Sequence, residues 1–154
     1  MGLLRAFEQF FLSKHPVEQV DLQEIACRPK TDRLLETFRT AVVGTEYTNA
    51  DGSERQRALE KLKVGDKVRL IWDRNRAGDR DLIYLLRGGR RQRLNLRDCF
   101  GRLNDKVAGD VARWLMRDNI GTCARVVQIN GRTRKRAKLG CVLELKTYQN
   151  PIRK

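Results

Sequence analysis

The chain has 154 residues, and 33 Lys and Arg against 19 Asp and Glu give it a net charge of +14. This length favours a single domain with a real core, and the basic excess favours nucleic acid over a membrane surface as partner. No segment stays apolar over the roughly 18 residues that a transmembrane helix needs, and residues 2–12 lack the features of a signal peptide.

The cysteines are Cys27, Cys99, Cys123 and Cys141, and they show no C-x-x-C pairing. With only one histidine in the chain, His15, a zinc site is not expected, and neither is any other metal or cofactor. Three of the cysteines lie in apolar, strand-like runs. Reduced thiols are therefore expected, as in a cytoplasmic protein, nucleoid-associated if bacterial.

Apolar residues between positions 3 and 12 recur at helical spacing and predict a short amphipathic helix. Its apolar face could dock a protein partner, and its few cations argue against membrane binding. Residues 17–25 favour another turn or two of helix, and residues 28–32 look like a linker.

The charge changes along the chain. Residues 1–36 hold five Lys or Arg and six Asp or Glu, whereas residues 37–154 hold 28 and 13. We therefore expect an N-terminal helical extension with linker (1–36), a domain (37–147) and a basic C-terminal tail (148–154).

Within this domain, residues 38–48 are rich in β-forming residues, and residues 49–52 form a turn signal. Ser53 and Gln56 have the spacing of a capping box, which predicts a helix over 54–63 with Gly65 at its C′ position. Residues 64–86 alternate as strand, polar turn and strand.

Gly88 and Gly89 mark a further turn. Asn104 can cap a helix over residues 105–118, with Trp114 and Leu115 expected to be buried. Residues 122–130 and 139–147 read as two more strands. The elements together predict a mainly β protein with two helices, of the α+β class.

Several motifs occur in the order found in the HIRAN family. They are Val42-Val43-Gly44 with Tyr47, Gly65 before a strand, Asp73-x-Asn75-x-x-x-Asp79-x-Asp81-x-Ile83, and Gly101-x-Leu103 before a helix. Residues 37–147 thus resemble HIRAN domains of Rad5-like remodellers and of standalone bacterial proteins. The resemblance implies a small OB-like antiparallel β-barrel with two helices, which in its best-known member grips the 3′ end of single-stranded DNA.

The resemblance also implies roles for individual residues. Tyr47 matches the aromatic residue that stacks on a base, and Asp79 matches the carboxylate that contacts the terminal 3′-hydroxyl. Gly78 stands where the family has an aromatic residue, and Glu46 stands where the DNA-binding member has arginine. The implied preference for a 3′ end is therefore weaker here.

Cations gather at three places in the domain: the turn after residue 73, the approach to the second helix, and the loop 131–138. They are Arg74, Arg76 and Arg80, then Arg102, then Arg132, Arg134, Lys135, Arg136 and Lys138. The cations within such a cluster repel one another unless an anion lies between them, so we expect these residues to contact nucleic-acid phosphates.

The expected function is a nucleic-acid-binding module for single-stranded DNA or DNA ends. RNA binding and a protein-interaction adaptor role remain open. An enzyme is not expected, because no P-loop, nucleophile elbow or H-E-x-x-H motif is present. Asp73, Asp79 and Asp81 could hold Mg²⁺ in a nuclease, but the arginines between them oppose that reading.

Overall fold

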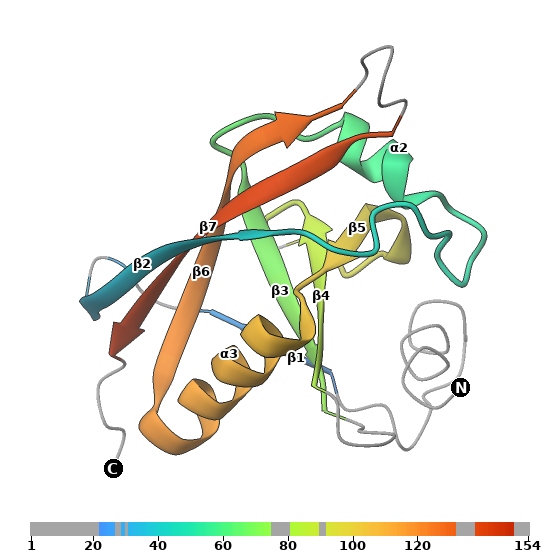
Figure 1. Ribbon diagram of the computed structural model, residues 1–154. Helices are drawn as coiled ribbons and strands as arrows, with labels where there is room; N and C mark the ends of the chain where they lie inside the picture. The colour runs from blue at the N-terminus through green and yellow to red at the C-terminus, as the bar shows by residue number, and fades with distance from the viewer. Residues whose placement is uncertain are drawn as a thin grey trace.

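The computed structural model describes residues 22–26, 29, 31–74, 81–89, 92–131 and 138–149. The helix expected over residues 3–12 lies outside these ranges. The elements, labelled as in Figure 1, are the strands β1 (Leu22–Ile25), β2 (Arg33–Ala41), β3 (Lys67–Asp73), β4 (Leu82–Arg87), β5 (Cys99–Arg102), β6 (Ile120–Asn130) and β7 (Gly140–Gln149), the helices α2 (Arg55–Glu60) and α3 (Asp105–Asp118), and the 3-10 turn η1 (Leu96–Asp98).

The strands form one antiparallel sheet in the order β2-β7-β6-β3-β4-β5, with β1 paired to β3. The mainly β, α+β class is therefore confirmed. The strand pairing does not close the expected barrel, because β2 and β5 end the path. The chain just after β2 reaches β5 through one isolated bridge, in which Val43 and Arg102 exchange two N–H···O bonds of 3.0 Å.

Two apolar clusters hold the sheet together. The larger lies between the sheet and its helices and includes Leu59, Leu85 and Leu143, all fully buried. The smaller lies on the opposite face of β3 and β4 and includes Ile71 and Tyr84. Because these two strands are covered on both faces, the apolar run of β4 shows no alternation with polar residues.

Helix α3 follows its local signals closely. Asn104 accepts a hydrogen bond of 2.9 Å from the Val107 N–H, and Asn119 ends the helix in the left-handed conformation at φ 54°. In Figure 1, α3 lies against the inner side of β6. Trp114 and Leu115 are only partly buried against the core, so the expectation that they are buried is wrong. The buried residues of α3 are instead Ala108, Val111 and Ala112.

The expected helix over 54–63 is shorter, covering residues 55–60. The predicted capping box is absent, because the N-cap residue is Glu54 and no side chain forms a capping hydrogen bond. Gln56 instead bonds to backbone groups outside the helix. Gly65 is not at the C′ position, although its φ of 96° does require glycine.

The N-terminal strand boundaries also differ from expectation. Residues 22–25 lie within the segment 17–25, for which a turn or two of helix is expected, but they pair with β3 and form strand β1 instead. The strand expected over 38–48 begins at Arg33 and ends at Ala41, shortly before Gly44 turns the chain at φ 69°. The expected boundary between residues 36 and 37 therefore falls inside β2. Strands β6 and β7 confirm the expected 122–130 and 139–147 to within two residues.

Cysteine chemistry departs from expectation at one position. Cys99 and Cys141 are buried free thiols, whereas Cys123 is disulfide-bonded. The expectation of reduced thiols is wrong for Cys123, so the inference of a cytoplasmic protein loses that support. In the described part of the chain, no helix has the length and apolar composition needed to cross a membrane.

Candidate nucleic-acid interface

Four of the expected contact residues can be placed: Tyr47, Arg74, Arg102 and Lys138. The remaining expected contacts lie outside the described residues; they are Arg76, Asp79, Arg80, Arg132, Arg134, Lys135 and Arg136.

The segment 42–54 carries Tyr47 and is held in place by hydrogen bonds from the buried Arg55 side chain. The Arg55 side chain is 4% exposed, and it donates from Nε to Asn49 Oδ1 and from Nη1 to the Gly44 carbonyl, each at 2.9 Å. Asn49 in turn donates to the carbonyl oxygens of Leu96 and Cys99 at 3.0 and 3.2 Å. Asn49 is thus held against η1 and β5, and Arg55 links Asn49 to Gly44 on the other side of Tyr47.

Tyr47 itself projects from this braced loop and is 59% exposed. The Arg55 guanidinium lies 6.0 Å from the centre of the ring, which is within reach of a cation–π contact. The ring is thus supported from the protein side and open on the other. An exposed aromatic ring on a fixed backbone can stack on an unpaired base with little loss of conformational freedom.

Gln56 joins the Tyr47 loop to the end of the basic loop 131–138. Its Nε2 donates to the carbonyl oxygens of Thr45 and Leu139, both at 3.0 Å, and its Oε1 accepts from the Leu139 N–H at 2.7 Å. The exposed Lys138 directly precedes Leu139. Two segments about 90 residues apart in sequence are therefore held within reach of one side chain.

Arg102 lies beside the start of the segment 42–54, because its backbone pairs with Val43. Its guanidinium is engaged locally: Nη1 donates to Asp105 Oδ1 at 3.0 Å and to the Leu103 carbonyl at 3.3 Å. Its positive charge is thus partly balanced. We call Tyr47, Arg102 and Lys138 together the Tyr47 surface.

Arg74 lies at the far end of β3. Its guanidinium is 5.3 Å from the centre of the buried Trp72 ring, and Nη1 donates to Gln23 Oε1 at 3.2 Å. Because β3 and β6 are antiparallel at Lys67 and Arg125, Arg74 just after β3 and Asn130 at the end of β6 lie at opposite ends of the sheet. Arg74 therefore does not lie beside Lys138, which precedes the β7 residues that pair with that end of β6.

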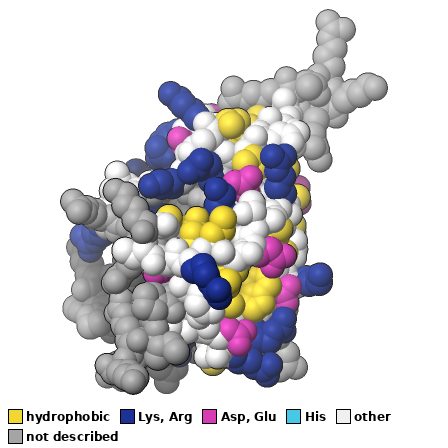
Figure 2. All heavy atoms as spheres, turned by 90° about the vertical axis from the view of Figure 1, so that its left-hand side faces the viewer, with side chains coloured by type: hydrophobic (Ala, Val, Ile, Leu, Met, Phe, Trp, Pro, Cys, Tyr) yellow, Lys and Arg dark blue, Asp and Glu magenta, His cyan; other side chains and the backbone are white. Residues whose placement is uncertain are grey.

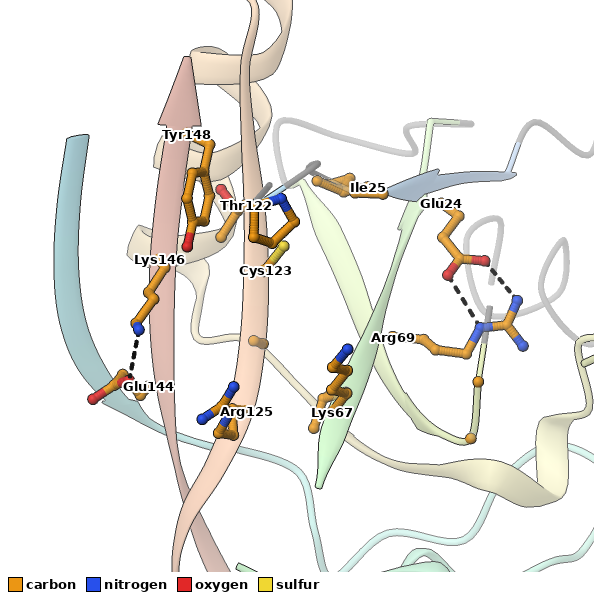
Figure 3. Close-up of a pocket in the computed structure, with 16 residues that line it drawn as sticks. Glu24, Ile25, Lys67, Arg69, Thr122, Cys123, Arg125, Glu144, Lys146 and Tyr148 are labelled. Carbon is orange, nitrogen blue, oxygen red and sulfur yellow. Dashed lines mark hydrogen bonds and ion pairs between the residues drawn. The ribbon is translucent and has the colours of Figure 1, made fainter. Parts of the chain in front are cut away.

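A cavity of about 450 Å³ lies where β1, β3, β6 and β7 meet (Figure 3). Sequence reasoning missed the cations that line it, Lys67, Arg69, Arg125 and Lys146. Strand register aligns Lys67, Arg125, Glu144 and Arg39 in one row across four strands. Nothing in the sequence places these residues side by side, because the row exists only once the register is known.

Figure 2 shows the face of the molecule seen from the left of Figure 1. Lys and Arg side chains spread over this face and are interrupted by apolar clusters and by a few carboxylates. Among the described residues, the cations on this face therefore do not form one continuous patch. Two exposed apolar residues of the edge strand β2, Leu34 and Leu35, are 50% and 40% exposed.

Among the residues that the structure describes, no three His, Cys, Asp or Glu side chains cluster as a metal site would require. Asp73 is buried and Asp81 half-buried, while Asp79 lies outside the described ranges. Compared with models of known protein families, with curated proteins and with solved structures, the chain matches none.

Proposed function

We propose that this protein is a nucleic-acid-binding module that contacts single-stranded DNA, or the single-stranded ends of DNA, through the Tyr47 surface. The observation that carries the proposal is the Gln56 bridge, which holds the loop of an exposed aromatic residue beside the end of a strongly basic loop. Base stacking and phosphate contact are the two elements of single-strand binding.

The proposed mode of binding assigns a role to each part. The Tyr47 ring stacks on a base, and the cations of residues 132–138 follow the phosphate backbone. The basic excess of +14 supports electrostatic attraction to the strand. The finer form of the proposal is an OB-like domain of the HIRAN type, in which Asp79 accepts a hydrogen bond from a 3′-hydroxyl.

The first experiment measures binding of a labelled single-stranded oligonucleotide by fluorescence anisotropy. Tyr47→Ala should weaken binding by about tenfold, since stacking contributes roughly 1–3 kcal/mol per base. The matched control is Met116→Ala, which truncates an apolar residue of α3 that is 68% exposed, somewhat more than Tyr47, and lies away from the Tyr47 surface. Equal affinities for the Tyr47 and Met116 variants would contradict the proposal.

The second experiment tests the basic loop through the salt dependence of binding. Replacing Arg134, Lys135 and Arg136 by Ala should shallow the plot of log affinity against log salt, since each phosphate contact on a single strand releases about 0.7 counterion. The control replaces three exposed cations of α3 instead: Lys106, Arg113 and Arg117. An unchanged slope in the loop variant would remove this loop from the interface.

A third experiment addresses the identity of the strand. Unlabelled RNA, blunt duplex and single-stranded DNA compete for the labelled strand, and we expect single-stranded DNA to compete best. Oligonucleotides ending in a 3′-hydroxyl or a 3′-phosphate are then compared with wild type and Asp79→Ala. A hydroxyl preference that disappears in the variant supports the HIRAN-type end contact, whereas stronger competition by RNA would reassign the module to RNA.

A further inference from the structure

The cavity of Figure 3 lies in a fork of the sheet. Strand β3 pairs with β6 only at Lys67 and Val68. From Leu70 onward, the same edge of β3 pairs with β1 instead. The cavity occupies the opening between the diverging strands, and residues of β1, β3, β6 and β7 line it.

Lys67 and Arg125 stand at the mouth of this fork, directly opposite each other in the antiparallel pairing. Directly paired residues place their side chains on the same face of a sheet, where like charges destabilise the pairing. Both side chains are exposed, and neither forms an ion pair with any residue that the structure describes. An anion between them would remove the repulsion.

Lys146 adds a third cation on the neighbouring strand β7, with its side chain 39% exposed. Figure 3 shows Lys146, Arg125 and Lys67 on adjacent strands of the fork. Glu144 is the carboxylate beside them: it lies opposite Arg125 in the register, and its Oε1 is 4.0 Å from Lys146 Nζ.

The other carboxylate of the cavity, Glu24, is already neutralised. It accepts two hydrogen bonds from the Arg69 guanidinium, drawn as dashed lines in Figure 3. Three cations and one carboxylate therefore remain, which leaves two positive charges at the mouth of the cavity. A phosphate monoester carries about −1.5 to −2 charges at neutral pH and matches this excess.

Apart from these charged groups and the Thr122 hydroxyl, the cavity is lined mainly by apolar side chains. Ile25, Val68, Ala124 and Tyr148 line it, and each is less than a tenth exposed. The volume of about 450 Å³ lies within the range of small-molecule sites, and apolar walls with a few charged groups are typical of such sites. The cavity therefore offers a charged mouth for an anionic group and an apolar interior for a ring.

We propose that the fork cavity is a binding site for a small organic phosphate of mononucleotide size. The phosphate group lies between Lys67, Arg125 and Lys146, and the organic part packs against Ile25 and Tyr148. This site is separate from the Tyr47 surface and does not depend on it.

The test uses isothermal titration calorimetry on the full chain, with adenosine monophosphate, adenosine and inorganic phosphate as probes. We expect the monophosphate to bind at least about tenfold more tightly than adenosine, because charge-assisted contacts to phosphate are the strong ones. Inorganic phosphate should compete with it. Absence of binding by every phosphate probe, or equal binding of adenosine, would overturn the proposal.

Two variants with opposite expected effects keep the test independent of folding. Lys67→Gln combined with Arg125→Gln should weaken monophosphate binding by about tenfold or more, without lowering thermal stability, because it removes a like-charge pair. Glu144→Gln should tighten monophosphate binding, because it removes the competing carboxylate. The control, Arg113→Gln with Arg117→Gln on α3, should change neither property.

The same variants separate this site from the proposed strand interface. Tyr47→Ala should leave monophosphate binding unchanged, and the Lys67 and Arg125 variant should change oligonucleotide affinity less than Tyr47→Ala does. If that double variant abolishes oligonucleotide binding while Tyr47→Ala has no effect, the fork belongs to a strand-binding surface. That outcome would overturn both the small-molecule proposal and the assignment of the strand to the Tyr47 surface.

Discussion

Arg69 and Glu24 form a bidentate ion pair that fastens β1 to the sheet. Arg69 Nε and Nη2 donate to the two carboxylate oxygens at 3.1 and 2.5 Å, and Nη1 donates to the Gln92 carbonyl at 3.0 Å. The Arg69 side chain is only 6% exposed. A guanidinium held this far from water needs its counterion, because the desolvation of an unpaired charge is costly.

Removal of the carboxylate should therefore destabilise the protein. We expect Glu24→Ala to lower the free energy of unfolding by about 3 kcal/mol, since it leaves the Arg69 charge buried and unpaired. Urea denaturation measures this change. The control is Glu54→Ala, which breaks the exposed Arg57 pair of 3.7 Å and should cost at most about 1 kcal/mol. Similar losses in the two variants would show that the Arg69 charge finds other compensation.

Asn49 is the second polar residue on which the fold depends. It is 3% exposed, donates to the Leu96 and Cys99 carbonyls and accepts from Arg55 Nε. Asn49→Ala leaves these three groups without their partner, and we expect a loss of about 3 kcal/mol in unfolding free energy. Urea denaturation again measures the unfolding free energy. The control is Asn95→Ala, which removes an exposed hydrogen bond that Asn95 Oδ1 accepts from the Arg97 N–H and should cost about 1 kcal/mol. Asn49→Ala should also weaken oligonucleotide binding, because Asn49 supports the Tyr47 loop.

Elements with strong local signals were predictable from the sequence. The Asn104 cap and the apolar spacing after it define α3, and the alternation in β6 and β7 defines two long strands. Tyr47 was predictable as a candidate contact from the HIRAN-like motifs, but its exposure and its support by Arg55 were not. A buried arginine that donates to a loop carbonyl and to an asparagine side chain looks like any surface cation in the sequence.

Features that depend on distant partners were not predictable. A turn or two of helix is expected over residues 17–25, yet residues 22–25 pair with β3, some 45 residues away, and that pairing decides their conformation. Gln56 has the spacing of a capping box, but its side chain bonds to Leu139 instead. Lys67 and Arg125 become neighbours only through the register of β3 and β6. Local propensity carries no information about such long-range contacts.

The disulfide at Cys123 gives a direct chemical prediction. Denatured protein alkylated without reductant should be modified at Cys99 and Cys141 but not at Cys123. Prior reduction should make Cys123 reactive as well. Peptide mass mapping distinguishes the positions and identifies the partner of Cys123. Alkylation of Cys123 without reductant would show that the bond does not form under the conditions of expression.

Alkaline pH should weaken the fold through its buried thiols and phenol. Burial raises the pKa of the Cys141 thiol from its ordinary value of 9.0 to about 12, and burial also raises the pKa of Cys99. The pKa of the Tyr84 phenol is likewise raised, chiefly by burial and then by the charge of Asp73. The unfolded chain therefore releases these protons at lower pH than the folded chain does.

The sign of the effect follows from this order of proton release. Stability from Cys141 is fully present below about pH 9 and is lost as pH rises from 9 toward 12, by at most about 1.4 kcal/mol per pH unit. The urea concentration at the unfolding midpoint should fall progressively when it is measured at about pH 8, 9 and 10, a range that spans the pKa of the thiol in the unfolded chain. Cys141→Ala is expected to be less stable at pH 8 because it opens a cavity, but its decline toward pH 10 should be shallower. An identical decline in the variant would show that Cys141 does not stay protonated in the folded protein, and that other groups carry the alkaline loss.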